Sequence, residues 1–308
     1  MPRTIIGVGA FGETVRKVQH ALVDAGFDTK GTDGRYGADT TKATTAFQVQ
    51  HGIQPTGIVD ELTWQTLMHA PVPPVSQRSL QLTAGFEGHG FELAIGNFDG
   101  ALITWGIIGF TLLNGEIQRI VLAVDAADPT LVPRAFGDRA GQLLALMRAA
   151  RPEQTAFAEA NTVMPGSGLA EPWKSGFAAF GALPAVQSEQ MALVQTEYLD
   201  HAIHTARGLG LTSELALALC FDIHVQDGGI KDAAMASIQA QRTASMGEAQ
   251  LLPIIARAVG NAARPAFAAD VLSRKLTIAT GQGTVHSTPY VLDNWGLRVD
   301  VEAEELTA

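Results

Sequence analysis

A chain of 308 residues is long enough for two domains, and a composition with 46% apolar and 17% charged residues is typical of a globular protein. The formal net charge of −10 argues against nucleic acid as a ligand and against a basic helix that disrupts membranes. No apolar run is long enough for a membrane span, and the first residues lack the apolar core and cleavage site of a signal peptide. The single cysteine, Cys220, cannot form an internal disulfide, and its apolar neighbours predict a buried packing residue.

Residues 12–68 contain three short apolar patterns at helical spacing, which predicts a small three-helix bundle with glycine-rich turns. The apolar positions are Val15, Val18 and Leu22, then Ala43, Ala46 and Phe47, then Leu62, Leu67 and Met68. Two turns look like copies of one motif, in which a glycine turn leads into a helix with a threonine near its start. The two threonines are Thr40 and Thr63.

This segment resembles the peptidoglycan-binding domain 1 family. The family pattern is matched by Val15/Val18-Gln19, Asp33-Gly34-Arg35-Tyr36-Gly37-Ala38-Asp39-Thr40, Phe47-Gln48, Gly52-Ile53, and Gly57 through Thr63-Trp64, with Asp60 in place of the usual second glycine. The resemblance implies that residues 1–70 bind peptidoglycan. Most of the motif residues are expected only to fold the bundle, while Tyr36 and Trp64 are the candidates for contact with sugar or peptide, because an aromatic face can lie against either.

A Pro-rich stretch follows, which contains Pro71, Pro73 and Pro74. Proline favours an extended, semi-rigid chain, so residues 71–78 are predicted to be a linker that holds two separate parts apart. Residues 79–308 would then form the second domain.

The second domain opens with a helical pattern that Gly88 should stop, which places Glu87 at a helix C-terminus. The partial negative charge of the helix end disfavours a carboxylate, so Glu87 is a candidate proton donor. Alternating apolar residues at Phe91, Leu93 and Ile95 then predict a strand, and residues 97–100 predict a turn that carries Asp99 in a more polar, ionised state. One protonated and one ionised carboxyl group are what a glycosidase needs to cleave a glycosidic bond.

The run Asp99-Gly100-Ala101-Leu102-Ile103-Thr104-Trp105-Gly106-Ile107-Ile108-Gly109-Phe110 resembles, without a gap, the motif Asp-Gly-x-Gly-Tyr-Thr-x-Gly-Ile-Ile-Gly-Phe of the family 46 chitosanases, which belong to the lysozyme-like superfamily. The resemblance implies that Glu87 is the general acid, Asp99 the general base and Thr104 the hydroxyl that holds the attacking water. It also places Glu116 where chitosanases carry an acidic sugar-binding residue. Leu102 and Ile103 replace the Gly and Tyr of the motif, and the spacing from acid to base is shorter than in the chitosanases.

The rest of the chain to about residue 280 is predicted to be mostly helical, with residues 215–221 as an apolar central helix. Looser similarities to the chitosanases occur at residues 218–229, with Asp227 in place of a histidine, and at residues 289–292. The expected fold class is therefore α+β and mostly helical: a three-helix bundle followed by a lysozyme-like, chitosanase-like domain with one β-hairpin and a cleft between lobes.

Three histidines, His201, His204 and His224, suggest a zinc site, but they lack metalloprotease spacing, so neither a metal nor another cofactor is expected. Asp222, on an apolar helix, is predicted to be a buried anion paired with an arginine such as Arg264 or Arg274.

These features favour a peptidoglycan hydrolase, an endolysin-like muramidase that cuts the glycan strand of the bacterial wall by general acid/base catalysis with inversion. Two alternatives stay open: a chitosanase-type glycosidase, and a non-catalytic wall-binding structural protein. The expected partner is bacterial peptidoglycan, without nucleic acid or membrane insertion, and the expected state is a monomer. Without a signal peptide, such a protein would be made in the cytoplasm of a host bacterium and would reach the wall after release through a membrane lesion, as for a bacteriophage or prophage enzyme.

Overall fold

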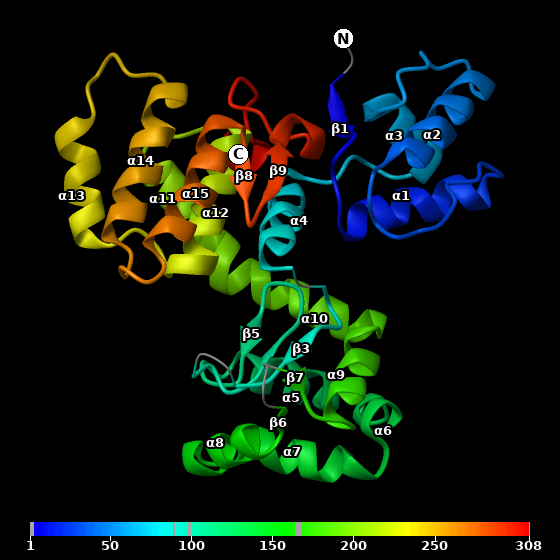
Figure 1. Ribbon diagram of the computed structural model, residues 1–308, viewed down its shortest axis with the longest axis vertical. Helices are drawn as coiled ribbons and strands as arrows, with labels where there is room; N and C mark the ends of the chain where they lie inside the picture. Colours follow the sequence, from blue (N-terminus) through cyan, green and yellow to red (C-terminus); the bar gives the residue numbers. More distant parts are fainter. Residues whose placement is uncertain (1–2, 89, 98–99, 164–167, 308) are drawn as a thin grey trace. The chain divides into compact units, whose positions relative to one another are not determined.

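The computed structural model describes residues 3–88, 90–97, 100–163 and 168–307 and divides the chain into two compact units (Figure 1). Unit 1 combines Met1–Phe86 with Tyr198–Ala308, and unit 2 is Glu87–Glu197. Within the described ranges, none of the helices has the length and apolar character needed to cross a bilayer.

Unit 1 contains most of the long helices. Its elements in chain order are β1 (Thr4–Ile6), α1 (Glu13–Asp24), α2 (Ala38–Gln50), β2 (Val59–Asp60), α3 (Glu61–Met68), α4 (Val75–Glu87), α11 (Asp200–Gly208), α12 (Glu214–Asp227), α13 (Asp232–Gln241), α14 (Glu248–Ala262), α15 (Ala268–Thr280), β8 (Gln282–Val285), β9 (Thr288–Val291), η3 (Leu292–Trp295) and α16 (Glu304–Thr307). The last residue of α4 already belongs to unit 2, and the π-helix η2 (Gln195–Leu199) crosses the second boundary.

The three predicted helices of the N-terminal bundle are present as α1, α2 and α3, and the two turn copies share one hydrogen-bonding design. In each copy a buried glutamine of the preceding helix accepts a hydrogen bond from the N–H of the turn glycine and donates one to the hydroxyl of the threonine near the next helix start. The sets are Gln19 with Gly34 (2.7 Å) and Thr40 (3.1 Å), and Gln48 with Gly57 (2.9 Å) and Thr63 (3.0 Å). Asp60, which departs from the family pattern, caps α3 by accepting a hydrogen bond from the Thr63 N–H at 2.8 Å.

The Pro-rich segment does not hold the N-terminal bundle apart from the rest of unit 1. Helix α4 begins at Val75, inside the predicted linker, and Gly7 donates a backbone hydrogen bond to the carbonyl of Asn294 at 2.9 Å. The ring of Phe11 lies 5.6 Å from Tyr290 and 5.4 Å from Trp295, measured between centroids. The expectation of a spacer is therefore corrected: proline stiffens the local chain, but apolar side chains on either side of it still bury one another.

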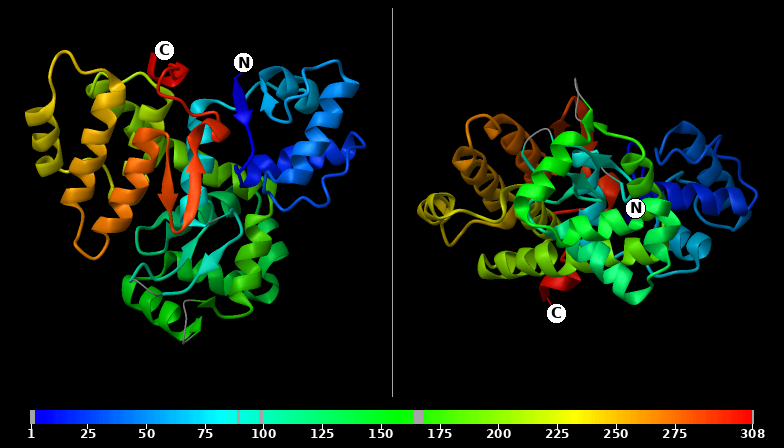
Figure 2. Two further views of the ribbon diagram at one scale, coloured as in Figure 1. Left: turned by 45° about the horizontal axis from the view of Figure 1, so that its top comes forward. Right: turned by 90° about the horizontal axis from the view of Figure 1, so that it is seen from below.

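The core of the later part of unit 1 is α12, whose residues from Glu214 to Ile223 are all buried, so the predicted central apolar helix is confirmed. Cys220 is buried there, and burial raises the pKa of its thiol to about 12. The β8–β9 hairpin follows α15 directly and lies beside it in Figures 1 and 2.

Unit 2 combines short strands with helices. Its elements are β3 (Ala94–Ile95), β4 (Thr104–Trp105), β5 (Phe110–Thr111), α5 (Glu116–Ala127), α6 (Leu131–Phe136), η1 (Gly137–Arg139), α7 (Ala140–Arg148), α8 (Arg151–Ala160), β6 (Thr162–Val163), β7 (Gly168–Leu169), α9 (Trp173–Gly181) and α10 (Pro184–Val194). The strands form one antiparallel sheet in the order β5-β4-β3-β7-β6. The predicted hairpin is thus part of a larger sheet, and the mostly helical α+β class is confirmed.

The sheet is fixed to α9 through Trp105, which is fully buried on β4. Its indole N–H donates to the carbonyl of Phe177 at 3.1 Å, and its ring lies 5.8 Å from that of Phe180, nearly parallel to it. An aromatic pair of this kind stabilises the contact beyond the area it buries. Strand β4, which carries Thr104, is therefore anchored to α9 on its buried side.

Candidate functional site

The predicted acid, Glu87, is the last residue of α4, and Gly88 follows it with φ +67°. Glycine adopts this left-handed conformation without a steric cost, so the chain can turn away directly after the helix. The side chain of Glu87 is partly exposed. The predicted helix end and the solvent access that a proton donor needs are both present.

The predicted base, Asp99, lies outside the described residues. Before it in the chain lies Asn97, whose side-chain oxygen accepts hydrogen bonds from the N–H groups of Gly100 (3.1 Å) and Leu102 (3.3 Å). The N–H of Asn97 in turn donates to the hydroxyl of Thr162 at 2.8 Å. Asparagine commonly makes such bonds to backbone N–H groups a few residues further along the chain.

Thr104, the predicted water-holding residue, lies on β4 between two partner strands. It is paired with Ile95 on β3 and with Thr111 on β5, and its side chain is half-buried. A residue in the middle of a sheet has its backbone held from both sides, so the hydroxyl of Thr104 projects from a fixed position.

Leu102 has a backbone conformation that favours glycine. It occupies the position of the second glycine in the chitosanase motif, and its φ is +70°, in the left-handed region that favours glycine. Its side chain is nevertheless 4% exposed, and that of Ile103, where the motif has tyrosine, is 0% exposed. Two apolar side chains are thus buried at these two positions of the motif, one of them on a left-handed backbone.

Glu116, the predicted sugar-binding residue, is the first residue of α5 and is only 4% exposed. Its carboxylate accepts hydrogen bonds from the N–H (2.8 Å) and the hydroxyl (3.2 Å) of Thr111. Since Thr111 pairs with Thr104, Glu116 supports the strand beside the predicted water-holding residue. A direct contact between Glu116 and a sugar stays a prediction.

Tyr36 and Trp64 do not present aromatic faces to a ligand. They are 2% and 5% exposed. The Tyr36 hydroxyl hydrogen-bonds with that of Thr44 (2.7 Å) and donates to the Gly57 carbonyl (3.0 Å), while the Trp64 indole N–H donates to the Pro71 carbonyl (2.9 Å). The predicted contact role of both is therefore corrected: their rings are buried, and the hydroxyl of Tyr36 and the indole N–H of Trp64 already have hydrogen-bond partners within the chain.

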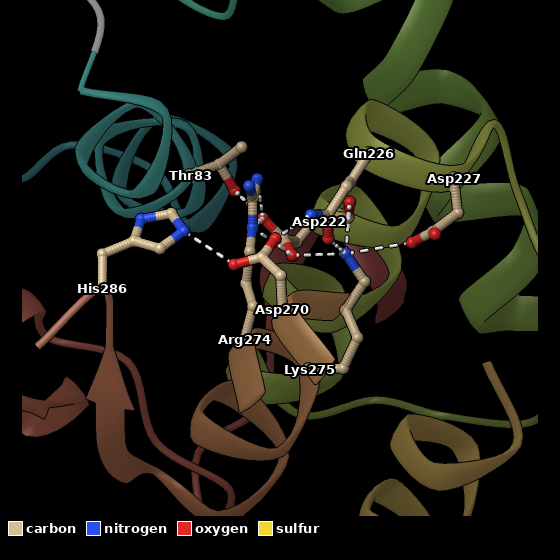
Figure 3. A network of polar contacts seen from close by, with 8 residues as sticks. All are labelled: Thr83, Asp222, Gln226, Asp227, Asp270, Arg274, Lys275 and His286. Carbon is tan, nitrogen blue, oxygen red and sulfur yellow. Dashed lines mark hydrogen bonds and ion pairs between the residues drawn. The ribbon is translucent and has the colours of Figure 1, made fainter. Parts of the chain in front are cut away.

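A buried ionic cluster joins three helices of unit 1 (Figure 3). Asp222 of α12 is fully buried and accepts hydrogen bonds from Arg274 (2.7 Å, Nη2 to Oδ1) and Lys275 (2.7 Å, Nζ to Oδ2) of α15, and from the Thr83 hydroxyl (2.9 Å) of α4. The guanidinium of Arg274 also lies over the ring of Phe86, 5.1 Å from its centroid. The predicted pairing of Asp222 with an arginine is confirmed for Arg274, and the cluster holds α4 in place near its C-terminal end.

The cluster continues to the surface through Gln226. Gln226 accepts from Lys275 (2.6 Å) and donates to Asp270 (2.8 Å), whose other oxygen meets His286 of the β8–β9 turn at 2.6 Å (Figure 3). The carboxylates of Asp222 and Asp270 and the amide of Gln226 therefore each have a partner of opposite hydrogen-bonding character.

The histidines of the zinc alternative are not gathered around a site. The rings of His201 and His224 are stacked with centroids 5.9 Å apart, and the Nε2 of His224 hydrogen-bonds with the Thr205 hydroxyl at 2.9 Å. Within the described ranges, no group of three or more His, Cys, Asp or Glu side chains is arranged to hold a metal ion.

One residue of this region was not found from the sequence. Gln190 of α10 is fully buried and hydrogen-bonds to the backbone of Phe91 and of Ile107. A single glutamine on a helix of mixed composition gives no local signal of such a role, because both partners lie far earlier in the chain.

Comparison with known families matches residues 11–67 to a putative peptidoglycan binding domain. Comparison with curated proteins gives no significant match. The predicted resemblance of the N-terminal segment is therefore confirmed by the family model.

Comparison with solved structures finds chitosanases. The GH46 chitosanase of Gynuella sunshinyii in complex with chitotetraose has a TM-score of 0.53 and 17% sequence identity, over 71% of this chain and 98% of that chain. A mutant chitosanase from Bacillus subtilis MY002 complexed with 6 GlcN has a TM-score of 0.52 and 18% identity, over 66% of this chain and 86% of that chain. At this identity the likeness establishes the fold alone, which is of the GH46 chitosanase type, in a chain whose residues 11–67 match the family model of a putative peptidoglycan binding domain.

Proposed function

We propose that this chain is a cell-wall glycoside hydrolase of the muramidase type, which cuts the glycan strand of peptidoglycan. The observation that carries the proposal is the hairpin of residues 100–111, which follows Glu87, matches the chitosanase motif in sequence without a gap and has a left-handed residue, Leu102, at the position of the motif's second glycine. The peptidoglycan-binding segment at residues 11–67 supports the wall as the place of action.

The proposed reaction is a single displacement. Glu87 protonates the oxygen of the leaving sugar, Thr104 orients a water molecule by hydrogen bonding, and Asp99 removes a proton from that water on the opposite face of the sugar ring. Such a mechanism inverts the anomeric carbon and needs a carboxyl separation of roughly 6.5 Å or more to admit the water. An NMR spectrum of the first products, recorded before mutarotation, tests the stereochemistry, and a retained anomer would overturn the mechanism.

Three variants assign the roles. Glu87→Gln should lose nearly all activity because an amide cannot donate the proton, and Asp99→Asn should lose most of it. Thr104→Ala should lose less, because a loosely held water can still react. Circular dichroism checks that each variant is folded, and a Glu87→Gln protein with a near wild-type rate would send the search for the acid to Glu92 or Glu116.

The substrate is the second part of the proposal. Peptidoglycan is favoured because the peptidoglycan-binding segment belongs to the same chain, and because Ile103 is buried where the chitosanase motif carries the hydroxyl of a tyrosine. A chitosanase is the second candidate, supported by the net charge of −10, which suits a cationic polymer, and by the fold.

Separate digestion of purified peptidoglycan and of chitosan distinguishes the two substrates. Mass spectrometry of the new reducing ends identifies the bond that is cut, with Glu87→Gln as the control for contaminating hydrolases. Faster turnover of chitosan at matched glycan concentration would contradict the muramidase assignment, and no turnover of either glycan would leave the wall-binding structural alternative. An endolysin-like origin, with synthesis in a bacterial cytoplasm and action on the wall after release, is part of the same proposal.

A further inference from the structure

The side chain of Gln190 joins two segments of unit 2 that are distant from it in sequence. Its Oε1 accepts a hydrogen bond from the N–H of Ile107 at 3.0 Å, and its Nε2 donates one to the carbonyl of Phe91 at 3.1 Å. The side chain is 0% exposed, so water does not compete for either bond.

The two segments are those that carry the proposed catalytic groups. Phe91 lies four residues after Glu87, in the stretch that leads from α4 to β3, and Ile107 lies three residues after Thr104, in the turn between β4 and β5. A direct backbone bond from Gly106 N–H to the Leu93 carbonyl, 3.1 Å long, joins the same segments beside the amide.

We propose that Gln190 is a positioning residue that fixes the segment after the acid Glu87 relative to the strand of Thr104, an inference that rests on the proposed glycosidase function. The reaction needs the proton donor and the bound water on opposite faces of one sugar, and a misplacement of about 1 Å can lower a rate about 100-fold. Loss of the bridge between the two segments should therefore lower kcat more than it changes KM.

Two glycines leave the space that the Gln190 amide and its partner carbonyl occupy. A Cβ atom on Gly106, whose φ is +89°, would lie 2.5 Å from the Oε1 of Gln190, and a Cβ on Gly181 would lie 2.1 Å from the Phe91 carbonyl oxygen. Both distances are far below contact distance, so side chains at these positions would push the amide and the carbonyl away. The close approach of α9 and α10 to the catalytic segments thus depends on the absence of two side chains.

An amide satisfies both partners at neutral pH, because one bond needs an acceptor and the other a donor, whereas a thioether or a carboxylate cannot donate. In Gln190→Met the shape is similar, but the Ile107 N–H and the Phe91 carbonyl lose their partner. In Gln190→Glu the carboxylate still accepts from Ile107 and repels the Phe91 carbonyl, whereas the protonated acid can donate to that carbonyl. Glutamate at this position should therefore work better as the pH falls.

The first test compares Gln190→Met with Gln154→Met in the full-length chain. Gln154 is a matched control: it is a buried glutamine of unit 2 whose amide donates to the Leu146 carbonyl at 3.2 Å and accepts from Gln118, and neither partner belongs to the two catalytic segments. On the glycan that the wild type cuts, Gln190→Met should lower kcat about 10- to 100-fold with KM changed less than about threefold. Gln154→Met should retain kcat within about threefold. Equal kcat values for the two variants would overturn the proposal.

The second test is the pH profile of Gln190→Glu divided by that of the wild type. This ratio should rise at least several-fold between neutral pH and the acid limit of stability, as the carboxyl at position 190 becomes protonated. A flat ratio contradicts the donor bond to Phe91. The profile also serves if Gln190→Met does not fold.

Hydrogen exchange separates this proposal from the proposed function. The Ile107 amide should be protected in the wild type and in Gln154→Met and lose protection in Gln190→Met, whether or not a glycan is present. A wild type that cuts neither glycan would refute the proposed function, while an Ile107 amide that stays protected in Gln190→Met would refute the bridge.

Discussion

At Leu102 the usual order of two substitutions should change: the Gly variant should lose less stability, relative to the Ala variant, than it does at an ordinary buried leucine. Both Leu102→Ala and Leu102→Gly remove a buried side chain, at a cost of about 2–5 kcal/mol. At an ordinary φ, glycine is a further 0.5–1 kcal/mol or so less stable than alanine because it loses more backbone freedom on folding. At the φ of +70° observed for Leu102, alanine instead carries a left-handed strain of about 1–2 kcal/mol that glycine does not have.

Leu112 provides the matched control. It is a fully buried leucine of unit 2 that is absent from the left-handed residues of the described chain, and its N–H donates to the Ile103 carbonyl at 2.9 Å. The difference in unfolding free energy between the Gly and Ala variants should therefore be shifted by about 1–2 kcal/mol toward Gly at position 102 relative to position 112. Urea unfolding followed by circular dichroism and tryptophan fluorescence measures both differences. Equal differences at the two positions would refute the claim that Leu102 is strained.

Three further predictions concern unit 1. Asp222→Asn should cost about 3–5 kcal/mol because it leaves two cations buried, and Lys275→Met should cost less because the Arg274 pair survives. Burial alone would raise the pKa of Asp222, but Arg274 and Lys275 outweigh it and lower that pKa to about 2. Its stabilisation is therefore complete above about pH 4 and is lost as the pH falls toward 2. In a chemical-denaturation series across this window, the free energy of unfolding should fall less steeply for Asp222→Asn than for the wild type, and equal slopes would contradict the assignment. Burial, with the charges of His201 and Lys231, lowers the pKa of His224 to about 4, so the unfolded chain binds more protons and stability should fall as the pH drops from about 6.5 to 4. Melting temperatures at pH 7 and 4.5 check this, and a His224→Gln variant with the same decrease would contradict it. Tyr36→Phe should lose about 1–2 kcal/mol of stability, since the Gly57 carbonyl loses its hydroxyl partner. It should still bind insoluble peptidoglycan in a pull-down. A folded variant that stays in the supernatant would restore a contact role for Tyr36.

The features predicted correctly from the sequence have local causes. The end of α4 at Glu87 follows from a helical pattern interrupted by Gly88, and the hydrogen bond from the Gly100 N–H to Asn97 follows from the side-chain chemistry of asparagine. The paired turns of the N-terminal bundle depend on glutamine, glycine and threonine at fixed spacing. Each of these signals acts over a short stretch of chain.

The features that were missed depend on contacts between distant residues. Motif aromatics such as Tyr36 do not reveal from spacing alone whether their rings face the core or a ligand, and here burial raises the pKa of the Tyr36 hydroxyl. Strands β6 and β7 have two residues each, too few to show a period of two. The bridge made by Gln190 depends on partners 83 and 99 residues away.

The aromatic contacts of Phe11 bear on how this protein can be recombined with others. Phe11 lies at the start of the segment matched by the family model, and its partners Tyr290 and Trp295 are near the other end of the chain, with Phe86 of α4 only 4.8 Å from Tyr290. A chimera cut at the proline-rich segment would uncover Tyr290 and Trp295 together and create an apolar patch that favours association. A replacement binding segment should therefore supply an aromatic side chain at the position of Phe11.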